Sequence, residues 1–73
     1  MPILEVKLIK GVFDKAQKEE IIHKLTETMV GIEGEAMRPV TFVTIEEVES
    51  GEWGIGGRAM TTQDVKDLQA SST

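Results

Sequence analysis

Two stretches of the chain show a period of two in their side chains, which predicts β-strands. In residues 3–10, Leu4, Val6 and Leu8 fall on one face, whereas the opposite face mixes apolar and charged side chains. Residues 40–48 have the sequence VTFVTIEEV, and such β-branched residues favour the pleated backbone of a strand. We therefore expect two strands, separated by a segment with a different period.

The segment between the strands has the period of an α-helix. From residue 15 to about residue 31, charged side chains occupy one side, and the other side carries an apolar stripe of Ile21, Ile22, Leu25 and Met29. Asp14 is the expected N-cap, and two glycines and a proline within residues 31–39 are expected to end the helix. A crossover of this kind joins parallel strands with a right-handed connection, which predicts a β-α-β unit.

The remainder of the chain predicts a hairpin and a short helix. Residues 50–57, SGEWGIGG, are dense in glycine, which permits the positive φ angles of a tight hairpin. Thr61 or Thr62 is expected to cap the helix, with Asp64 completing a capping box with Thr61 and with Val65 and Leu68 facing inward. We expect the tail from about residue 70 to fray. Residues 1–73 are expected to form a single α/β domain.

Self-association is the expected source of additional stability. One helix covers only one face of a two-stranded parallel sheet, yet such sheets are normally covered on both faces. The second face would expose the apolar residues Ile3, Ile9, Phe42 and Val48. A chain of this size also buries only about 60% of the surface of its unfolded form. Because cysteine is absent and His23 is the only histidine, neither disulfides nor a thiolate or multi-histidine metal site can contribute.

The net charge and the hydropathy of the chain limit the classes of partner and the cellular compartment that we expect. The net charge is −5, with 13 acidic against 8 basic residues, which argues against binding to nucleic acid phosphates. Apolar runs fall short of the roughly 18–20 residues that span a bilayer. The start, MPILEVKL, lacks the basic region and long apolar stretch of a signal peptide, so a cytoplasmic protein is expected.

Pro2 is the candidate catalytic residue. Removal of Met1 would expose a secondary amine, and α-amino groups titrate at about 7.7–8.0 in model peptides. Apolar surroundings lower the pKa of an amine, and proton transfer works best with a pKa near the operating pH. Met-Pro starts are common by themselves, so this role depends on the rest of the chain. Trp53 offers a broad apolar ring that would disfavour the ammonium form, and its alternative role is packing in the hairpin or an interface.

Five features of the chain occur in a fixed order and spacing. They are Pro2, the MPILEVKL strand, the helix starting near Asp14, the VTFVTIEEV strand and the Trp-Gly-Ile-Gly-Gly run at 53–57. In this combination the chain resembles the 4-oxalocrotonate tautomerase family over residues 2–60. The resemblance implies β-α-β subunits that pair and usually form a hexamer, built as a trimer of dimers. It also implies that the amino-terminal proline, here Pro2, is the base, and that the aromatic residue before GIGG, here Trp53, lines the pocket.

The chain departs from the family at two positions. The best-known members carry an arginine after the glycine that ends the first strand, where Val12 follows Gly11 here, and another where Phe42 stands. Those arginines bind the two carboxylates of a dicarboxylate substrate and stabilise the enol charge. Arg58, then Arg38, are the candidate replacements, with Lys10 also near a loop. Each is alternatively a solvated surface residue or a partner in an intersubunit ion pair.

Residues and resemblance together predict an isomerase that catalyses enol–keto tautomerisation of a small carbonyl (2-oxo) acid without metal or cofactor. Pro2 would be catalytic, and the substrate would contact Trp53, Arg58, Arg38 and Phe42. One alternative is a hydratase or dehalogenase in which the proline acts as an acid or a nucleophile. Another is a non-catalytic oligomeric subunit, either a degenerate paralogue or one partner of a mixed assembly, which the missing arginines make credible.

Overall fold

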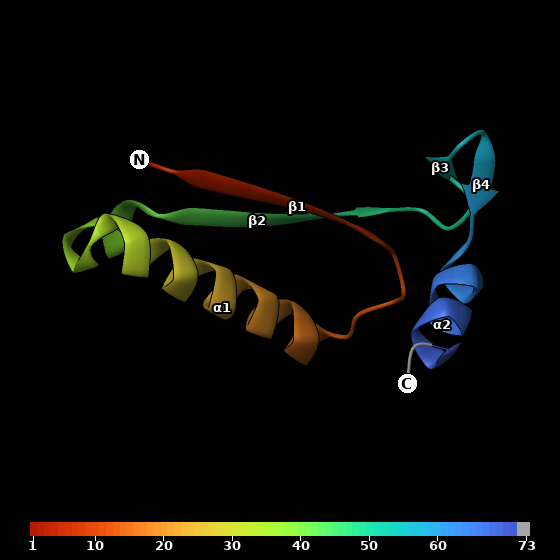
Figure 1. Cartoon of the computed structure of the whole chain (residues 1–73), viewed down its shortest axis with the longest axis horizontal. Helices are drawn as coiled ribbons and strands as arrows, with labels where there is room; N and C mark the ends of the chain where they lie inside the picture. Colours follow the sequence, from red (N-terminus) through yellow and green to blue (C-terminus); the bar gives the residue numbers. More distant parts are fainter. Residues whose placement is uncertain (72–73) are drawn as a thin grey trace.

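The computed structural model describes residues 1–71 and contains a two-stranded parallel sheet with a helix along one face (Figure 1). Strand β1 (Ile3–Ile9) lies beside strand β2 (Phe42–Val48), and helix α1 (Lys15–Glu33) connects them. The strands pair in parallel from Ile3 opposite Phe42 to Ile9 opposite Val48. The predicted β-α-β unit is therefore confirmed.

Helix α1 begins at the predicted N-cap. The Gln17 N–H donates to the Asp14 carboxylate at 2.8 Å, and the Asp14 N–H donates to the Gln17 side chain at 2.9 Å. This reciprocal pair is a capping box, which satisfies backbone donors that the first helical turn leaves free. At the other end, Gly34 has a φ of 108° and its N–H donates to the Val30 carbonyl at 2.8 Å. Glycine tolerates this backbone conformation, so the helix ends there.

The exit from α1 differs from the sequence expectation. Gly31 remains helical, and residues Glu35–Val40 form a short 3₁₀ helix, η1, which the sequence did not predict. Strand β2 begins at Phe42 instead of residue 40, because the Thr41 N–H still donates to the Arg38 carbonyl at 3.3 Å. The start of β2 is thus set by the end of η1.

The buried core is small and lies between the sheet and α1. Among the described residues, Ile9 and Val30 are the buried apolar side chains, and Leu4, Val6 and Leu8 are half-buried. On the opposite face Ile3 and Phe42 are exposed as expected, but Ile9 is buried and Val48 is half-buried. The expectation for Ile9 was wrong because the segment after β2 folds back at this end of the sheet.

The glycine-rich segment forms the predicted hairpin, in which β3 (Trp53–Ile55) pairs antiparallel with β4 (Arg58–Met60). Gly56 and Gly57 form its turn with φ angles of 58° and 87°. Two positive φ angles in a two-residue loop match the twist of a hairpin, which explains the paired glycines.

Helix α2 (Thr62–Ser71) follows the hairpin and starts with the predicted capping box. The Thr61 N–H donates to the Asp64 carboxylate at 3.0 Å, and the Asp64 N–H donates to the Thr61 hydroxyl at 3.1 Å. Val65 is half-buried, but Leu68 is 65% exposed and does not face inward. The chain is helical through Ser71, and fraying of the tail from about residue 70 stays a prediction; residues 72–73 lie outside the described part.

Thr62 attaches the hairpin and α2 to the end of β1. Its hydroxyl donates to the Lys10 carbonyl, and its N–H donates to the Ser50 hydroxyl at 2.9 Å. Gly11 has a φ of 91°, and a Cβ at this position would lie 3.1 Å from the Thr62 methyl group. Both the backbone conformation and the close approach therefore require glycine. This junction holds the hairpin beyond the carboxyl ends of the strands (Figure 1).

Candidate active site

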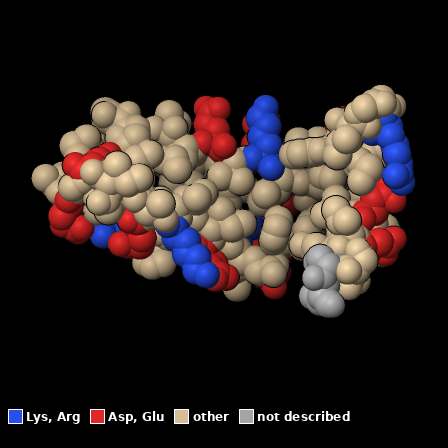
Figure 2. All heavy atoms as spheres, in the orientation of Figure 1, with Lys and Arg blue, Asp and Glu red and all other residues tan. Residues whose placement is uncertain are grey.

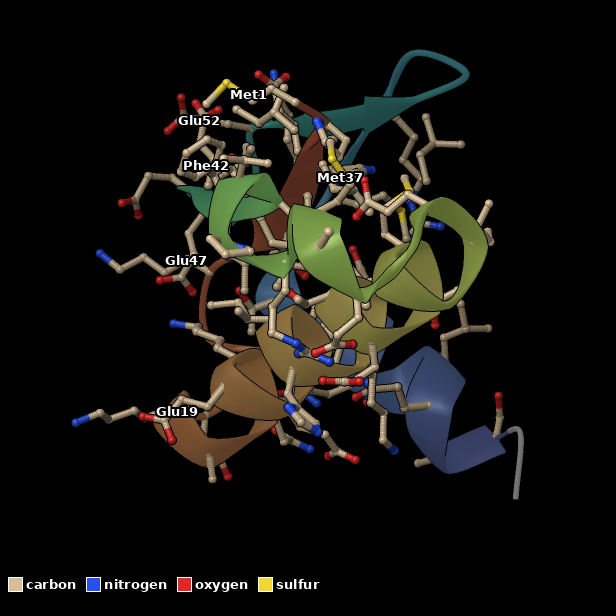
Figure 3. All side chains as sticks on the ribbon, turned by 90° about the vertical axis from the view of Figure 1, so that its left-hand side faces the viewer. Met1, Glu19, Met37, Phe42, Glu47 and Glu52 are labelled. Carbon is tan, nitrogen blue, oxygen red and sulfur yellow. The ribbon has the colours of Figure 1, made fainter. Side chains whose placement is uncertain are left out.

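Pro2 lies at the amino end of the sheet, where the first backbone hydrogen bond between the strands forms. The Phe42 N–H donates to the Pro2 carbonyl at 3.0 Å, and Pro2 is half-buried, whereas Met1 is 78% exposed. Met1 and Phe42 lie together at this end in Figure 3. While Met1 is attached, the Pro2 nitrogen is an amide without a basic lone pair. Cleavage of Met1 would leave a secondary amine on an ordered strand.

Phe42 and Ile3 form an apolar surface beside Pro2. They are opposite one another in the strand register, so their side chains share one face of the sheet. This face points away from α1, and the side chains are 47% and 59% exposed. A substrate at Pro2 would therefore meet apolar side chains rather than charged ones on this side.

Arg38 is engaged by two carboxylates. Its Nη1 and Nη2 donate to Glu27 at 2.6 and 3.1 Å, and its Nε and Nη2 donate to Glu35 at 2.7 and 3.2 Å. These hydrogen bonds lower the pKa values of the Glu27 and Glu35 carboxyls and raise the pKa of Arg38. Four of the five guanidinium N–H donors are directed at α1 and η1, so Arg38 holds η1 against α1.

Trp53 and Arg58 lie on the hairpin. Trp53 is opposite Met60, and Ile55 is opposite Arg58. Because side chains alternate along a strand and opposite residues share a face, these four side chains occupy one face of the hairpin. Trp53 is half-buried, and the Arg58 side chain is 70% exposed. The Trp53 ring and the Arg58 guanidinium therefore lie on the same face of the hairpin.

The contact between Arg58 and Asp64 is weak. The Arg58 Nη2 lies 3.4 Å from the Asp64 carboxylate. The pKa of Asp64 is lowered mainly by hydrogen bonds from the Thr61 backbone and side chain, and Arg58 contributes least. The capping box therefore occupies Asp64, and Arg58 is the less engaged of the two arginines in the sequence.

A single chain does not bring all the candidate residues together. Pro2, Phe42 and Arg38 lie at the amino end of the sheet, whereas Trp53 and Arg58 lie on the hairpin at the opposite end (Figure 1). The longest dimension of the molecule is 42 Å. Lys10 is also at the hairpin end, where its Nζ lies 3.2 Å from Glu49. A site containing both Pro2 and Trp53 requires two copies of the chain.

An open groove of about 410 Å³ lies between β4 and α2 and is lined by Arg58, Met60, Asp64, Asp67, Leu68 and Ser71. It lies at the hairpin end of the molecule, away from Pro2, and it places the Asp64 and Asp67 carboxylates beside the Arg58 guanidinium. Within the described residues, no group of three His, Cys, Asp or Glu side chains is placed to hold a metal ion. No helix in residues 1–71 has the length and apolarity needed to cross a membrane.

The charged surface is mixed rather than segregated. On the face in Figure 2, basic side chains are scattered and several have acidic neighbours. Ion pairs join Lys7 to Glu46 at 4.0 Å and Lys18 to Glu47 at 2.8 Å. Such pairing leaves few basic groups available for an anionic ligand.

The 3₁₀ helix η1 and the contact between Glu27 and Arg38 were not predicted from the sequence. Glu35 and Arg38 are three positions apart, a spacing that favours contact on a helix, but η1 was not foreseen. Glu27 is eleven positions from Arg38, and its contact depends on how η1 turns back on α1. The spacing in the sequence indicates the contact between Arg38 and Glu35, but it gives no indication of the contact between Arg38 and Glu27.

Comparison with known proteins agrees with this architecture. A family model described as "Tautomerase enzyme" matches residues 2–63. The chain is 34% identical over 61 residues to Probable tautomerase K2 of Dickeya dadantii (strain 3937), covering 84% of this chain and 90% of that protein. A crystal structure described as apo unFused 4-OT matches with a TM-score of 0.70 and 28% identity, covering 86% of this chain and 97% of that one.

The chain therefore belongs to the tautomerase family. The β-α-β unit with its hairpin and short helix matches the 4-OT fold, which supports the 4-oxalocrotonate tautomerase family in particular.

Proposed function

We propose that the chain is a cofactor-independent isomerase that interconverts the enol and keto forms of a small 2-oxo acid. The base would be the secondary amine of Pro2 after removal of Met1. The observation that carries the proposal is the placement of Pro2: it is half-buried, fixed to β2 through its carbonyl, and beside exposed Phe42. Family membership supports tautomerase chemistry for this chain.

The proposed reaction is a proton shuttle. The Pro2 nitrogen takes a proton from an enol hydroxyl or an α-carbon and returns one to a conjugated carbon, so no net electron transfer occurs. Apolar neighbours disfavour the ammonium form, which keeps part of the amine unprotonated near neutral pH. A cation beside the developing oxyanion would stabilise the transition state.

We assign that cation to Arg58 rather than Arg38. Arg38 is already held by Glu27 and Glu35, whereas Arg58 is largely exposed and lies on the same hairpin face as Trp53. Substrate binding by Arg38 remains a prediction that this geometry does not favour. Phe42 and Trp53 would form the apolar walls.

The site would form between copies of the chain in a cytoplasmic oligomer, with a hexamer as the expected assembly. Two observations support self-association: the exposed apolar face at Ile3 and Phe42, and the separation of Pro2 from Trp53 within one chain. Apolar surface of this kind is normally covered in a parallel sheet.

The test is a comparison of two amino termini. Intact-mass measurement should show loss of Met1, and the processed protein should ketonise phenylenolpyruvate. A variant with one residue added before Pro2 should keep its assembly and lose this activity, because the Pro2 nitrogen is then an amide. Equal activity in the blocked variant would exclude Pro2 as the base.

The position of Phe42 favours one alternative worth testing. The family resemblance implies arginines where Phe42 and Val12 stand in this chain, and their absence supports a non-catalytic subunit as the alternative. Such a subunit would assemble normally and show no activity in either form. A proline acting as an acid would instead give activity that falls as pH rises through the pKa of Pro2.

A further inference from the structure

Pro2 is ordered by the first hydrogen bond of the parallel ladder, at the end where the strands begin. We propose that Thr41 is a positioning residue for the Pro2 base. Its hydroxyl ties the start of β2 to Glu33 at the end of α1, and this contact holds the Phe42 N–H on the Pro2 carbonyl. The inference rests on the proposed function and adds the residue that orients its base.

The hydrogen bond between Phe42 and Pro2 lies at the end of the ladder and has support on one side only. Bonds at the ends of elements open at a small free-energy cost. On the β1 side Met1 is 78% exposed, and after its removal no residue precedes Pro2. On the β2 side, η1 connects the strand to α1, and the end of α1 lies at the same end of the molecule as the amino terminus (Figure 1). The support for this bond therefore comes from the segment that leads into β2.

Thr41 directly precedes Phe42 and is bound to both α1 and η1. Its hydroxyl contacts the Glu33 carboxylate and the Met37 carbonyl, the latter at 2.8 Å. A hydroxyl has one proton and donates to one acceptor at a time, and the contact with the charged carboxylate is the stronger of the two. The Thr41 N–H also donates to the Arg38 carbonyl at 3.3 Å. Because the peptide group between Thr41 and Phe42 is planar, fixing Thr41 also restricts the direction of the Phe42 N–H.

Glu33 occupies a position that does not favour a carboxylate for the sake of the helix. It is the last residue of α1, and the C-terminal end of a helix carries the negative end of the helix dipole. The last turn of α1, which lies wholly within the described residues, has no basic side chain. Glu33 is nevertheless half-buried, and its carboxylate accepts from Thr41. The contact with Thr41 accounts for this residue, whereas helix stability does not.

Thr41 acts on Pro2 from the side of the sheet that carries α1. Its backbone is extended, with φ −96° and ψ 116°, so its side chain and that of Phe42 point to opposite sides. Phe42 is exposed on the face that points away from α1. A change of the Thr41 side chain therefore leaves the exposed apolar face unaltered, and it should affect the position of Pro2 rather than assembly or substrate contact.

The experiment compares Thr41→Val with Thr41→Ser in the processed, assembled protein, with phenylenolpyruvate as the substrate. Valine keeps the shape of threonine but lacks the hydroxyl, whereas serine keeps the hydroxyl. We expect kcat of Thr41→Val to fall about tenfold, because a displaced base lowers the rate of the chemical step. KM should stay within about twofold of the value for the unaltered protein, since no substrate contact is lost. Thr41→Ser should recover most of kcat.

Hydrogen exchange measured by NMR locates the effect. The Phe42 amide should exchange about tenfold faster in Thr41→Val, because the end of the ladder opens more often. The Lys10 amide donates to the Val48 carbonyl at 2.8 Å at the other end of the ladder, and it should keep its original rate. A purely global loss of stability would instead increase both rates.

Thr28→Val is the matched control. The Thr28 hydroxyl donates to the Lys24 carbonyl at 2.9 Å within α1, so its removal should change neither kcat nor the exchange of the Phe42 amide. Glu33→Ala should reproduce the effects of Thr41→Val. The double variant should be no worse than either single variant, because both substitutions remove the same contact. Size-exclusion chromatography shows whether each variant still assembles.

An unchanged kcat in assembled Thr41→Val would overturn the inference while leaving Pro2-dependent tautomerisation intact. A fall in kcat that Thr41→Ser does not recover would overturn it as well, since the hydroxyl would not be the cause. Absence of turnover in the unaltered protein, or turnover that survives blocking of the Pro2 nitrogen, would instead refute the proposed function, and the inference with it. If Thr41→Val fails to assemble, Glu33→Ala removes the same contact and decides the question by the same measurements.

Discussion

The Phe42 N–H donates a 3.0 Å hydrogen bond to the Pro2 carbonyl, which joins the start of β2 to the proposed catalytic residue. This contact places an exposed aromatic side chain beside a proline at the first position before β1. A base held on a strand keeps a fixed direction for its lone pair, which a base on a mobile terminus does not. The hydrogen bond thus connects the β-α-β fold to the proposed chemistry.

Replacing Phe42 should shift the pH dependence of the reaction. Phe42→Gln makes the surroundings of the Pro2 amine more polar, which favours the ammonium form and raises its pKa. The acid limb of the kcat/KM profile should therefore move to higher pH, whereas Phe42→Leu should leave it nearly in place. An unchanged profile in Phe42→Gln would show that Phe42 does not influence the base.

Arg38→Gln should loosen η1 without weakening substrate binding. The substitution removes the contacts of Arg38 with Glu27 and Glu35, so the amides of Thr41 and Phe42 should exchange hydrogen faster and the melting temperature should fall. The KM for a monocarboxylate substrate should stay within about twofold of the parent value. Loss of a charge-assisted contact to the substrate would instead raise KM about tenfold. A tenfold rise in KM at an unchanged melting temperature would assign Arg38 to substrate binding.

Gly11→Ala should destabilise the junction between β1 and α2. The positive φ of Gly11 costs an alanine about 1–2 kcal/mol, and the added methyl group would also contact Thr62. Gly51→Ala is a matched control, because Gly51 has a φ of 86° and no atom within 4 Å of the added Cβ. Denaturant unfolding should show a larger loss for Gly11→Ala, and Thr62→Ser should relieve the difference by removing the methyl group. Equal losses at both glycines would refute the proposed close contact.

Acid should weaken the attachment of α1 to β2. The hydrogen bond from Lys18 lowers the pKa of Glu47 below its ordinary value of 4.5. A carboxyl with a lowered pKa in the folded state stabilises the protein above its unfolded pKa and loses this contribution as pH falls through the folded pKa. The free energy of unfolding of Glu47→Gln should therefore differ most from that of the parent at pH 7, and the two should converge as the pH falls below 4.5 and through the lowered pKa of Glu47.

Glu46→Gln is the control for this pH series. Glu46 is adjacent on β2, but its contact with Lys7 is 4.0 Å and both side chains are exposed. Exposed ion pairs contribute little to stability, so this variant should follow the parent at every pH. A pH-independent difference for Glu47→Gln would show that the charge of Glu47 is not the cause.

Local signals in the sequence predicted the elements well. Asp14 and the Thr61–Asp64 pair begin their helices as expected, because capping depends on residues three positions apart. The parallel pairing of β1 and β2 followed from a single helical crossover.

Features that depend on contacts distant in sequence were not predicted. The burial of Ile9 depends on how the chain after β2 returns to Lys10, and the Glu27–Arg38 contact depends on η1. The sequence likewise placed Pro2 and Trp53 in one site without showing that a single chain separates them. That separation becomes visible only when the hairpin is placed beyond the far end of the sheet.

The most direct test of the account is a ¹⁵N NMR titration of the processed protein labelled at proline. The chain has two prolines, and Pro39 is an internal amide that cannot titrate, so it serves as a control within the same sample. Ordinary α-amino groups have a pKa of about 7.7–8.0, and we predict that the Pro2 nitrogen titrates with a lower pKa. This pKa should coincide with the acid limb of kcat/KM. A Pro2 nitrogen that does not titrate, or whose titration leaves the rate unchanged, would contradict its role as the base.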